Sequence, residues 1–579
     1  MKASALAATI LIGASCSSAS ATAVNYTLGP FTVTVDAEES SVGVVNSVGD
    51  QVWKSASDRA FVSASTGLTT ITQASGNFQL SSENVGTRCQ TATISSATTS
   101  SADRVDITGV FCDASCYGWT WTLSFALDAS YDNVSDDSQP LAFNASVAGD
   151  GVDNVYMAYE SPKDEAFFGL GEQTGIGNLR GWRVPVWTRE GGVGRGEEPV
   201  TTYLNSNASI SGAFAGGSLL TTYTGIGSLT SSLGRWFVLG GTKYALVDLA
   251  SNATSAFEDT AAGYLAGNIT ERDYVTGSTT TLEIMYESTS LSGWLGRAAK
   301  GNPLLEATNA LTKVTGRQPK LPDWSHDGAI LGIQGGQDFV EGVIQDALDA
   351  NMPLVSVWLQ DWSGTRLQTG AYGISLHRLW WNWEPDTTLY PTWAEWVPHL
   401  QSTYGVRTMS YINTFLANVS TKTTGFNTSF YAIAASEGRF VANATAGDGS
   451  VWTITSGPGI DAGLLDLSNQ STVDWFKGLV KKQYYTVPIS GMMQDFGDVE
   501  VYLPPLQVDS QGAAVNSTAF TYKHLWSGVE YAAGQTVTVA APWGQPGVFV
   551  RWPVTAAEGL QLQQLWEFVV AESATVLVA

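Results

Sequence analysis

The chain has 579 residues, and its 53 acidic and 28 basic side chains give a formal charge of −25. This excess of acid argues against nucleic acids and anionic membranes as partners, because both would repel the protein. The length allows two or three domains with sizeable cores.

The N-terminus has the pattern of a signal peptide. Lys2 precedes an apolar run that extends through Ile12, and small residues follow up to Ala23. We predict that residues 1–23 are removed and that the mature chain is secreted and extracellular. Eleven N-x-[ST] sequons fit a glycoprotein, although chance supplies many of them in a Ser/Thr-rich chain. No later stretch approaches the eighteen or so uninterrupted apolar residues of a membrane helix.

Aromatic residues are frequent, whereas charged residues are few. The chain contains 21 Trp, and only 14% of its residues are charged. This composition suits an extracellular carbohydrate-active protein, because sugar rings stack on aromatic faces. Trp residues that simply fill hydrophobic cores are the alternative interpretation.

Residues 24–318 are rich in Ser, Thr and Gly, and short alternating runs such as FTVTVDA, WTWTLSFAL and TTLEIMY lie between turn residues. This pattern predicts a large antiparallel β-sandwich. The domain holds Cys89, Cys112 and Cys116, an odd number that leaves one thiol over. We expect one disulfide from Cys89 to either of the other two. No Cys/His cluster has metal-ligand spacing, so we expect no metal site and no cofactor.

From about Lys320, strands alternate with amphipathic helices, which implies parallel pairing. Strands are expected at Ala329 to Ile333, at Leu354 to Leu359, from Arg407 and from Gly491. The helices between them contain apolar stripes. These stripes are Phe339, Val340, Val343, Ile344, Ala347 and Leu348 in the first helix, the stretch near Trp393 to Leu400, and Val473, Trp475, Phe476, Leu479 and Val480 in the third.

Four such units can be counted, whereas a closed (β/α)8 barrel needs eight in roughly 250 residues. A further helix is expected from Phe520 to Ala533, after which the chain returns to β alternation. We therefore divide the chain into the sandwich at 24–318, an incomplete (β/α)8 barrel at 319–533 and a remnant of a C-terminal β domain at 534–579.

Polar side chains follow the expected parallel strands where each of them ends. Asp495 ends the strand GMMQD, and Gln334, Asp361 and Asn413 end the three earlier strands. Side chains at the C-termini of barrel strands face the open mouth, where chemistry takes place. One carboxylate with several hydrogen-bonding groups indicates a sugar site.

Seven ordered motifs resemble glycoside hydrolase family 31, in particular its sulfoquinovosidase branch. They are FFGLGEQ (167–173), NLRG (178–181), PVWTREGGVGRG (185–196), GIQGG (332–336), WLQDWSG (358–364), HRLWWNW (377–383) and QDFGD (494–498). The resemblance implies an N-terminal β-sandwich, a (β/α)8 barrel and C-terminal β domains. It also implies cleavage of α-glycosides with retention, through a covalent glycosyl-enzyme.

The resemblance assigns roles to five residues. Asp495 matches the nucleophile, Gln334 and Gln360 match two pocket glutamines, and Arg378 and Trp381 match the pair that grips a sulfonate. A guanidinium keeps its charge at every relevant pH, and an indole N–H can donate to a sulfonate oxygen.

Purely structural roles are the alternatives for Asp495 and Arg378. Asp495 could cap a helix or turn. Arg378 could stack on Trp380, Trp381 or Trp383 as a structural cation–π pair.

The chain departs from the family after the fourth strand. The family's acid/base aspartate, a sulfonate-site tyrosine and a substrate-binding histidine all lie further along the barrel, and no matching sequence is found. We therefore expect the chain as written to be inactive. An α-glucosidase or α-xylosidase of the same family and a non-catalytic carbohydrate-binding glycoprotein are the alternatives. The aglycone, the oligomeric state and the origin of the gap, whether gene-model error, splice variant or deletion, stay open.

Overall fold

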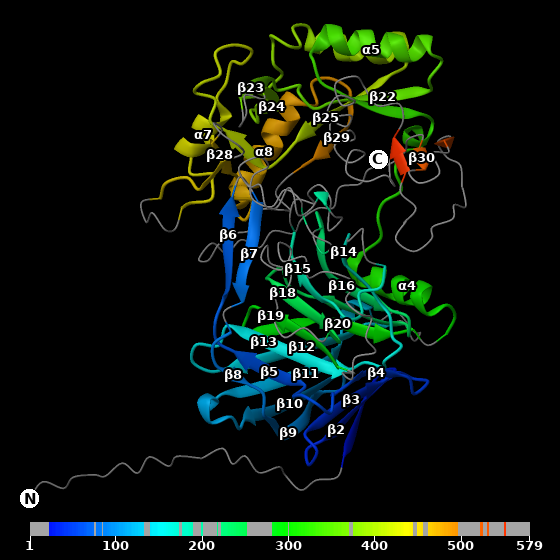
Figure 1. Cartoon of the computed structure of the whole chain (residues 1–579), viewed down its shortest axis with the longest axis vertical. Helices are drawn as coiled ribbons and strands as arrows, with labels where there is room; N and C mark the ends of the chain where they lie inside the picture. Colours follow the sequence, from blue (N-terminus) through cyan, green and yellow to red (C-terminus); the bar gives the residue numbers. More distant parts are fainter. Residues whose placement is uncertain are drawn as a thin grey trace, which may run out of the picture. The chain divides into compact units, whose positions relative to one another are not determined.

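The computed structural model describes residues 23–74, 77–83, 85–131, 139–172, 177–188, 199–200, 217, 220, 222–251, 281–298, 300–369, 375–443, 449–455, 461–495, 522–524, 530–531 and 549–551. These residues form two compact units (Figure 1). The first unit comprises the described residues up to Gln318, apart from the segments 73–78 and 197–216. The second comprises those segments and everything described from Pro319 onwards.

Antiparallel sheets build the first unit. A four-stranded sheet has the order β1 (Val24–Leu28), β2 (Phe31–Asp36), β3 (Ser41–Val45), β4 (Gln51–Lys54). An eight-stranded sheet has the order β14 (Phe167–Gly171), β16 (Gly225–Ser231), β17 (Arg235–Leu239), β20 (Ser290–Arg297), β12 (Leu141–Ala148), β11 (Thr120–Leu127), β10 (Arg104–Phe111), β9 (Ala92–Ser101). A six-stranded sheet has the order β15 (Arg183–Val186), β18 (Ala245–Leu249), β19 (Thr281–Tyr286), β13 (Asn154–Glu160), β5 (Val62–Ser65), β8 (Arg88–Cys89).

One hydrophobic core lies between the two large sheets and confirms the expected β-rich N-terminal domain. It includes Ile107 and Leu123 of the eight-stranded sheet together with Val155 and Val247 of the six-stranded sheet, all fully buried. Strand β2 shows the underlying rule, because its alternate residues are buried. The ribbon β6 (Thr69–Ala74)–β7 (Asn77–Glu83) and the short 3₁₀ helices η1 (Ala114–Cys116) and η2 (Ala129–Tyr131) complete the strand-rich part.

The disulfide joins Cys89 to Cys116 and so resolves the choice that the sequence left open. The turn η1 buries Cys116 completely, beside the equally buried Cys89 at the end of β8. Cys112 is also disulfide-bonded, and no described cysteine is free, so the expected left-over thiol is not observed.

Helix α4 (Pro303–Thr315) closes the first unit. The Asn302 side chain accepts hydrogen bonds from the backbone N–H groups of Leu304 and Leu305, and Pro303 stands at the first helical position. Both features favour a helix start. The helix packs Ala307 and Ala310 against Trp236 of β17.

The second unit is organised around a parallel sheet with the order β21 (Ala329–Ile333), β22 (Leu354–Leu359), β25 (Arg407–Ile412), β29 (Ile489–Gln494). Its connecting helices are α5 (Gln337–Asp349), α6 (Trp393–Tyr404), α7 (Phe430–Ser436) and α8 (Gln470–Gln483). Figure 1 labels α5, α7 and α8 among them. The four predicted strands and their parallel pairing are therefore confirmed, and the described residues contain a partial α/β barrel. Phe339 was wrongly counted on the apolar stripe of α5, since 57% of it is exposed.

Smaller elements surround this sheet. They are η3 (Asp323–His326), the hairpin β23 (Thr365–Thr369)–β24 (Ser375–Leu379), and the sheet β26 (Phe415–Ala417), β28 (Asp461–Leu464), β27 (Thr453–Thr455). A last sheet has the order β31 (Glu530–Tyr531), β30 (Tyr522–His524), β32 (Phe549–Arg551). Among the residues that the structure describes, no helix is both long and apolar enough to cross a bilayer.

The helix expected from Phe520 to Ala533 is wrong for its described residues. Tyr522 to His524 form a strand, and this strand pairs with Phe549–Arg551 on the far side of the boundary drawn at 533/534. The apolar spacing resembled a helical stripe. The aromatic residues also favour strands, and pairing with a distant strand decides between the two.

Candidate active site

The register of the parallel sheet places Gln334, Gln360, Asn413 and Asp495 on one face, whereas the expected strand-end residue Asp361 alternates away from it. Gly332, Trp358, Met409 and Gly491 are neighbours across the four strands. Side chains two residues further along a strand lie on the same face. Gln334, Gln360 and Tyr411 stand two residues after Gly332, Trp358 and Met409. Asn413 and Asp495 stand four residues after Met409 and Gly491, so they share the same face.

Gln334 and Gln360 are in direct contact on this face. The Gln334 side-chain amide donates a hydrogen bond to the Gln360 side-chain oxygen. Gln334 is exposed and Gln360 is half-buried, so both retain polar atoms that can reach a ligand. The two predicted glutamines therefore form one hydrogen-bonding pair.

A buried carboxylate holds this pair in place. The Gly335 backbone N–H donates to Asp361 Oδ2 at 2.8 Å, and the Tyr390 hydroxyl donates to Asp361 Oδ1. Because Gly335 follows Gln334 and Asp361 follows Gln360, the carboxylate ties the two strand ends together. Asp361 is completely buried, and this burial raises its pKa.

Asp495 continues the last strand by one residue. Its backbone N–H donates to the Ile412 carbonyl oxygen at 2.9 Å, which extends the ladder between β25 and β29. The Tyr411 hydroxyl donates to Asp495 Oδ2 at 2.6 Å. Asn413 Nδ2 lies 3.2 Å from the same hydroxyl oxygen and donates to it. The predicted nucleophile is thus held by the neighbouring strand.

Arg378 and Trp381 come from the β23–β24 hairpin and the residues that follow it. Arg378 is exposed and stands opposite Arg366 in the hairpin register. The guanidinium over the Trp380 ring, at 5.8 Å from its centroid, is that of Arg366. Trp381 is 94% buried, and its ring packs on Phe415 with centroids 5.7 Å apart. The roles of Arg378 and Trp381 stay predictions.

A buried ion pair fixes the loop after this hairpin. Lys422 Nζ lies 2.9 Å from Asp386 Oδ2, and these side chains are only 5% and 6% exposed. Lys422 also donates to the Ser363 carbonyl oxygen at 2.9 Å. Gly364, with φ 95°, packs directly against the Asp386 carboxylate, where a Cβ atom would collide with it. The segment that carries Arg378 is therefore anchored at both of its ends.

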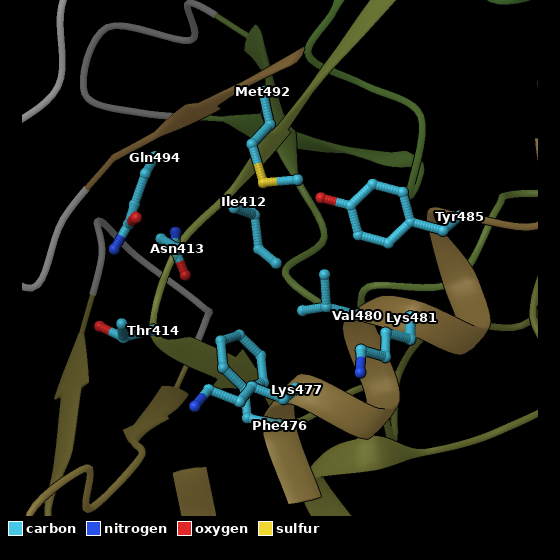
Figure 2. A pocket seen from close by; sticks show the side chains of 10 residues that line it. All are labelled: Ile412, Asn413, Thr414, Phe476, Lys477, Val480, Lys481, Tyr485, Met492 and Gln494. Atoms are coloured by element: carbon cyan, nitrogen blue, oxygen red, sulfur yellow. The ribbon is translucent and has the colours of Figure 1, made fainter. Parts of the chain in front are cut away.

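A cavity of about 320 Å³ is lined by residues at the ends of β25 and β29 and by residues of α8. Figure 2 shows the side chains of Ile412, Met492 and Val480 around its centre, with Gln494 to one side. Phe476, Asn413, Thr414, Lys477, Lys481 and Tyr485 complete the lining. None of the five predicted site residues lines this cavity. On β29 the lining alternates, because Met492 and Gln494 line the cavity and Met493 and Asp495 do not, whereas on β25 Ile412 and Asn413 both line it.

Sequence reasoning missed Tyr411, Tyr390 and the Lys422–Asp386 pair. The strand RTMSYIN did give a signal for Tyr411, because residues 409, 411 and 413 must share the face that carries Asp495. Asp361 stands directly after Gln360 and was noted only as part of a strand end. Nothing in the sequence pairs Lys422 with Asp386.

Residues 319–551 match the family domain described as the glycosyl hydrolases family 31 TIM-barrel domain. A sulfoquinovosidase of Escherichia coli K12 is 26% identical over 437 residues, which cover 74% of this chain and 56% of that protein. A sulfoquinovosidase of Agrobacterium fabrum C58 is 28% identical over 379 residues, which cover 65% of this chain and 49% of that protein. The chain thus spans about half the length of these curated relatives.

A solved structure supports the same fold. The family 31 sulfoquinovosidase from E. rectale, in complex with an aza-sugar inhibitor, superposes with a TM-score of 0.62 and 23% identity. The superposition covers 80% of this chain and 58% of that one. At this identity the likeness establishes the fold alone.

Proposed function

Since residues 319–551 place this chain in glycoside hydrolase family 31, we propose that its site is that of a secreted, retaining α-glycosidase for α-sulfoquinovosides. The observation that carries the proposal is the shared face of the parallel sheet. On it the Gln334–Gln360 pair stands beside a strand end where Tyr411 donates to Asp495 at 2.6 Å. The resemblance of the motifs and the two sulfoquinovosidase relatives support the substrate class.

Asp495 performs the first chemical step in this proposal. One of its carboxylate oxygens attacks the anomeric carbon, and the bond from that carbon to the leaving oxygen breaks. The leaving oxygen takes the electron pair together with a proton from a second carboxyl group, which retaining enzymes place about 5 to 5.5 Å away. Water then releases the sugar with retention of configuration. Gln334 and Gln360 orient the sugar hydroxyls.

Arg378 and Trp381 provide the preference for a sulfonated sugar. A charge-assisted hydrogen bond is about twice as strong as a neutral one, so an exposed guanidinium favours the anion over a hydroxymethyl group. An α-glucosidase or α-xylosidase would have no use for this clamp. The guanidinium over Trp380 is that of Arg366 and not that of Arg378, which weighs against a stacking role of Arg378 on this ring.

The chain as written is proposed to be inactive on ordinary glycosides, because no residue matches the family's proton donor. General acid catalysis typically contributes 10²–10⁴-fold, and a poor leaving group cannot depart without it. A non-catalytic carbohydrate-binding protein is therefore the second candidate. We propose removal of residues 1–23 on secretion, which N-terminal sequencing of secreted material checks by a start at Val24.

An activated substrate separates these possibilities in the chain as it exists. Fluoride leaves with its electron pair and needs no proton donor, so an α-sulfoquinovosyl fluoride should still glycosylate Asp495. The missing acid/base also slows hydrolysis of the adduct, which should accumulate. Intact-mass and peptide mass spectrometry should find one sugar on Asp495 and none in Asp495→Asn.

The same experiment can overturn the proposal. An α-sulfoquinovosyl fluoride that binds without forming an adduct would favour the carbohydrate-binding protein. Turnover of an aryl α-glycoside, abolished in Asp495→Asn, would show that the chain has a proton donor after all. Faster labelling by an α-glucosyl fluoride would favour the α-glucosidase alternative.

A further inference from the structure

Tyr411 is buried at a junction of four structural elements. Only 1% of the residue is exposed, and its backbone carbonyl oxygen accepts two hydrogen bonds. Trp362 Nε1, just after β22, donates at 2.8 Å, and the Tyr484 hydroxyl, just after α8, donates at 2.6 Å. Burial raises the pKa of Tyr484 well above its usual range, so this phenol keeps its proton and remains a donor.

The Tyr411 side chain is fixed as firmly as its backbone. Asn413 Nδ2 donates to the Tyr411 hydroxyl oxygen at 3.2 Å, and Asn413 Oδ1 accepts from the Phe415 backbone N–H at 2.9 Å. Asn413 is itself only 1% exposed. The accepted hydrogen bond leaves the Tyr411 proton directed at Asp495 Oδ2. The chain from Phe415 through Asn413 and Tyr411 to Asp495 therefore has one direction of donation.

From this geometry we infer that Tyr411, held by Asn413, is the positioning residue of Asp495: it keeps the carboxylate ionised and in one orientation. The inference rests on the proposed nucleophilic role of Asp495. A nucleophile held in one rotamer loses little entropy on reaching the attack geometry. A hydrogen bond to the ionised form also stabilises that form.

Other charged and titratable groups surround this point on the described elements. Lys477 and Lys481 of α8 line the same cavity as Gln494. Tyr484 donates to the backbone of Tyr411 rather than to a carboxylate. None of these is altered by removal of the Tyr411 hydroxyl, so the effect of that hydroxyl can be measured separately.

The test measures the protonation of Asp495 directly. A carbodiimide activates a carboxyl group in its protonated form, and an added amine then gives a stable amide. The modified fraction of the Asp495 peptide, followed by mass spectrometry against pH, gives a midpoint for the folded chain. Tyr411→Phe removes one oxygen atom and should move this midpoint upward by about one to two pH units, as loss of a hydrogen bond to a charged group requires.

Tyr404→Phe is the matched control. The Tyr404 hydroxyl donates to Glu341 Oε1 at 3.0 Å, so it is a phenol–carboxylate pair on the helices α5 and α6. This variant removes a phenol hydroxyl elsewhere in the same unit and should leave the Asp495 midpoint unchanged. If Tyr411→Phe fails to fold by circular dichroism, Asn413→Ala replaces it, with a smaller upward shift expected because the Tyr411 hydroxyl then loses only its orientation.

Glycosyl fluoride labelling distinguishes the two levels of the proposal. Suppose that the wild-type chain labels at Asp495 but the midpoint in Tyr411→Phe stays within 0.3 pH unit of the wild-type midpoint (roughly a twofold effect). This result would overturn the positioning role of Tyr411 and leave the proposed glycosidase activity intact. A shifted midpoint without any labelling would overturn the proposed function but not the contact. Positioning further predicts that Tyr411→Phe slows labelling at saturating sugar without weakening sugar binding.

Discussion

The buried Lys422–Asp386 pair gives the sharpest test of how the second unit is held together. Replacing Lys422 by Met keeps the length of the side chain but leaves the Asp386 carboxylate without its cation. Loss of one partner of a buried ion pair costs about 3–5 kcal/mol. Asp386 Oδ1 keeps the backbone N–H groups of Thr388 and Leu389 at 2.8 and 3.0 Å. We therefore expect the lower end, about 3 kcal/mol, or about 6–12 °C in Tm.

Differential scanning calorimetry of the full chain measures this shift, because the two units can unfold in separate transitions. Lys320→Met is the control, since Lys320 pairs with Asp323 where the side chains are 79% and 84% exposed. It should produce no measurable shift. Adding Asp386→Asn to Lys422→Met should recover much of the lost stability, because no charge then remains buried. A double variant that is less stable than Lys422→Met would refute the reasoning.

The remaining predictions concern the disulfide, a buried acid and the sulfonate clamp. Replacing Cys89 and Cys116 by Ser removes a cross-link between residues 27 positions apart, and the free energy of unfolding should fall by about 3.5 kcal/mol through loop entropy. Calorimetry should show this as a lower Tm of the first unit, the transition that Lys422→Met does not shift. Burial raises the pKa of Asp361, so the folded state binds its proton more tightly than the unfolded state and stability should fall as pH rises from about 4. The slope should be flatter in Asp361→Asn, and equal slopes in urea melts from pH 4 to 7 would contradict this. Arg378→Ala should slow labelling of Asp495 by the sulfonated fluoride about tenfold more than by the neutral one, whereas equal losses would indicate a structural role.

The parallel sheet was predictable because its strands are continuous apolar runs that end at polar residues. Burial on both faces requires such runs, so strands β21 and β22 begin and end where the sequence indicated. The same logic found Asp495 and Gln334, since the end of a parallel strand is a position that the sequence marks directly, whereas Gln360 was assigned by the family resemblance.

The contacts that support those residues were not predictable in the same way. Tyr390 reaches Asp361 across 29 positions, and the Trp362 indole reaches the Tyr411 carbonyl across 49. Such pairs depend on how helices and loops return to the sheet, which local periodicity does not encode. The disulfide partner of Cys89 could not be predicted because it is decided by one short turn, η1. Strand β30 could not be predicted because it forms by pairing with residues some 25 positions further on.

The hairpin that carries Arg378 stores electrostatic strain. Arg366 and Arg378 face each other across the two strands, and burial together with the field of Arg378 lowers the pKa of Arg366. Like charges directly opposite destabilise a strand pair, so the empty hairpin is less stable than its backbone pairing alone would make it. An anion that binds beside these guanidinium groups would relieve that repulsion and so stabilise the hairpin. Salt screens both the Arg366–Arg378 repulsion and the attraction of these groups to an anion. If Arg378 binds a sulfonate as proposed, the preference for a charged over a neutral sugar would therefore weaken as ionic strength rises, without any change in the shape of the site.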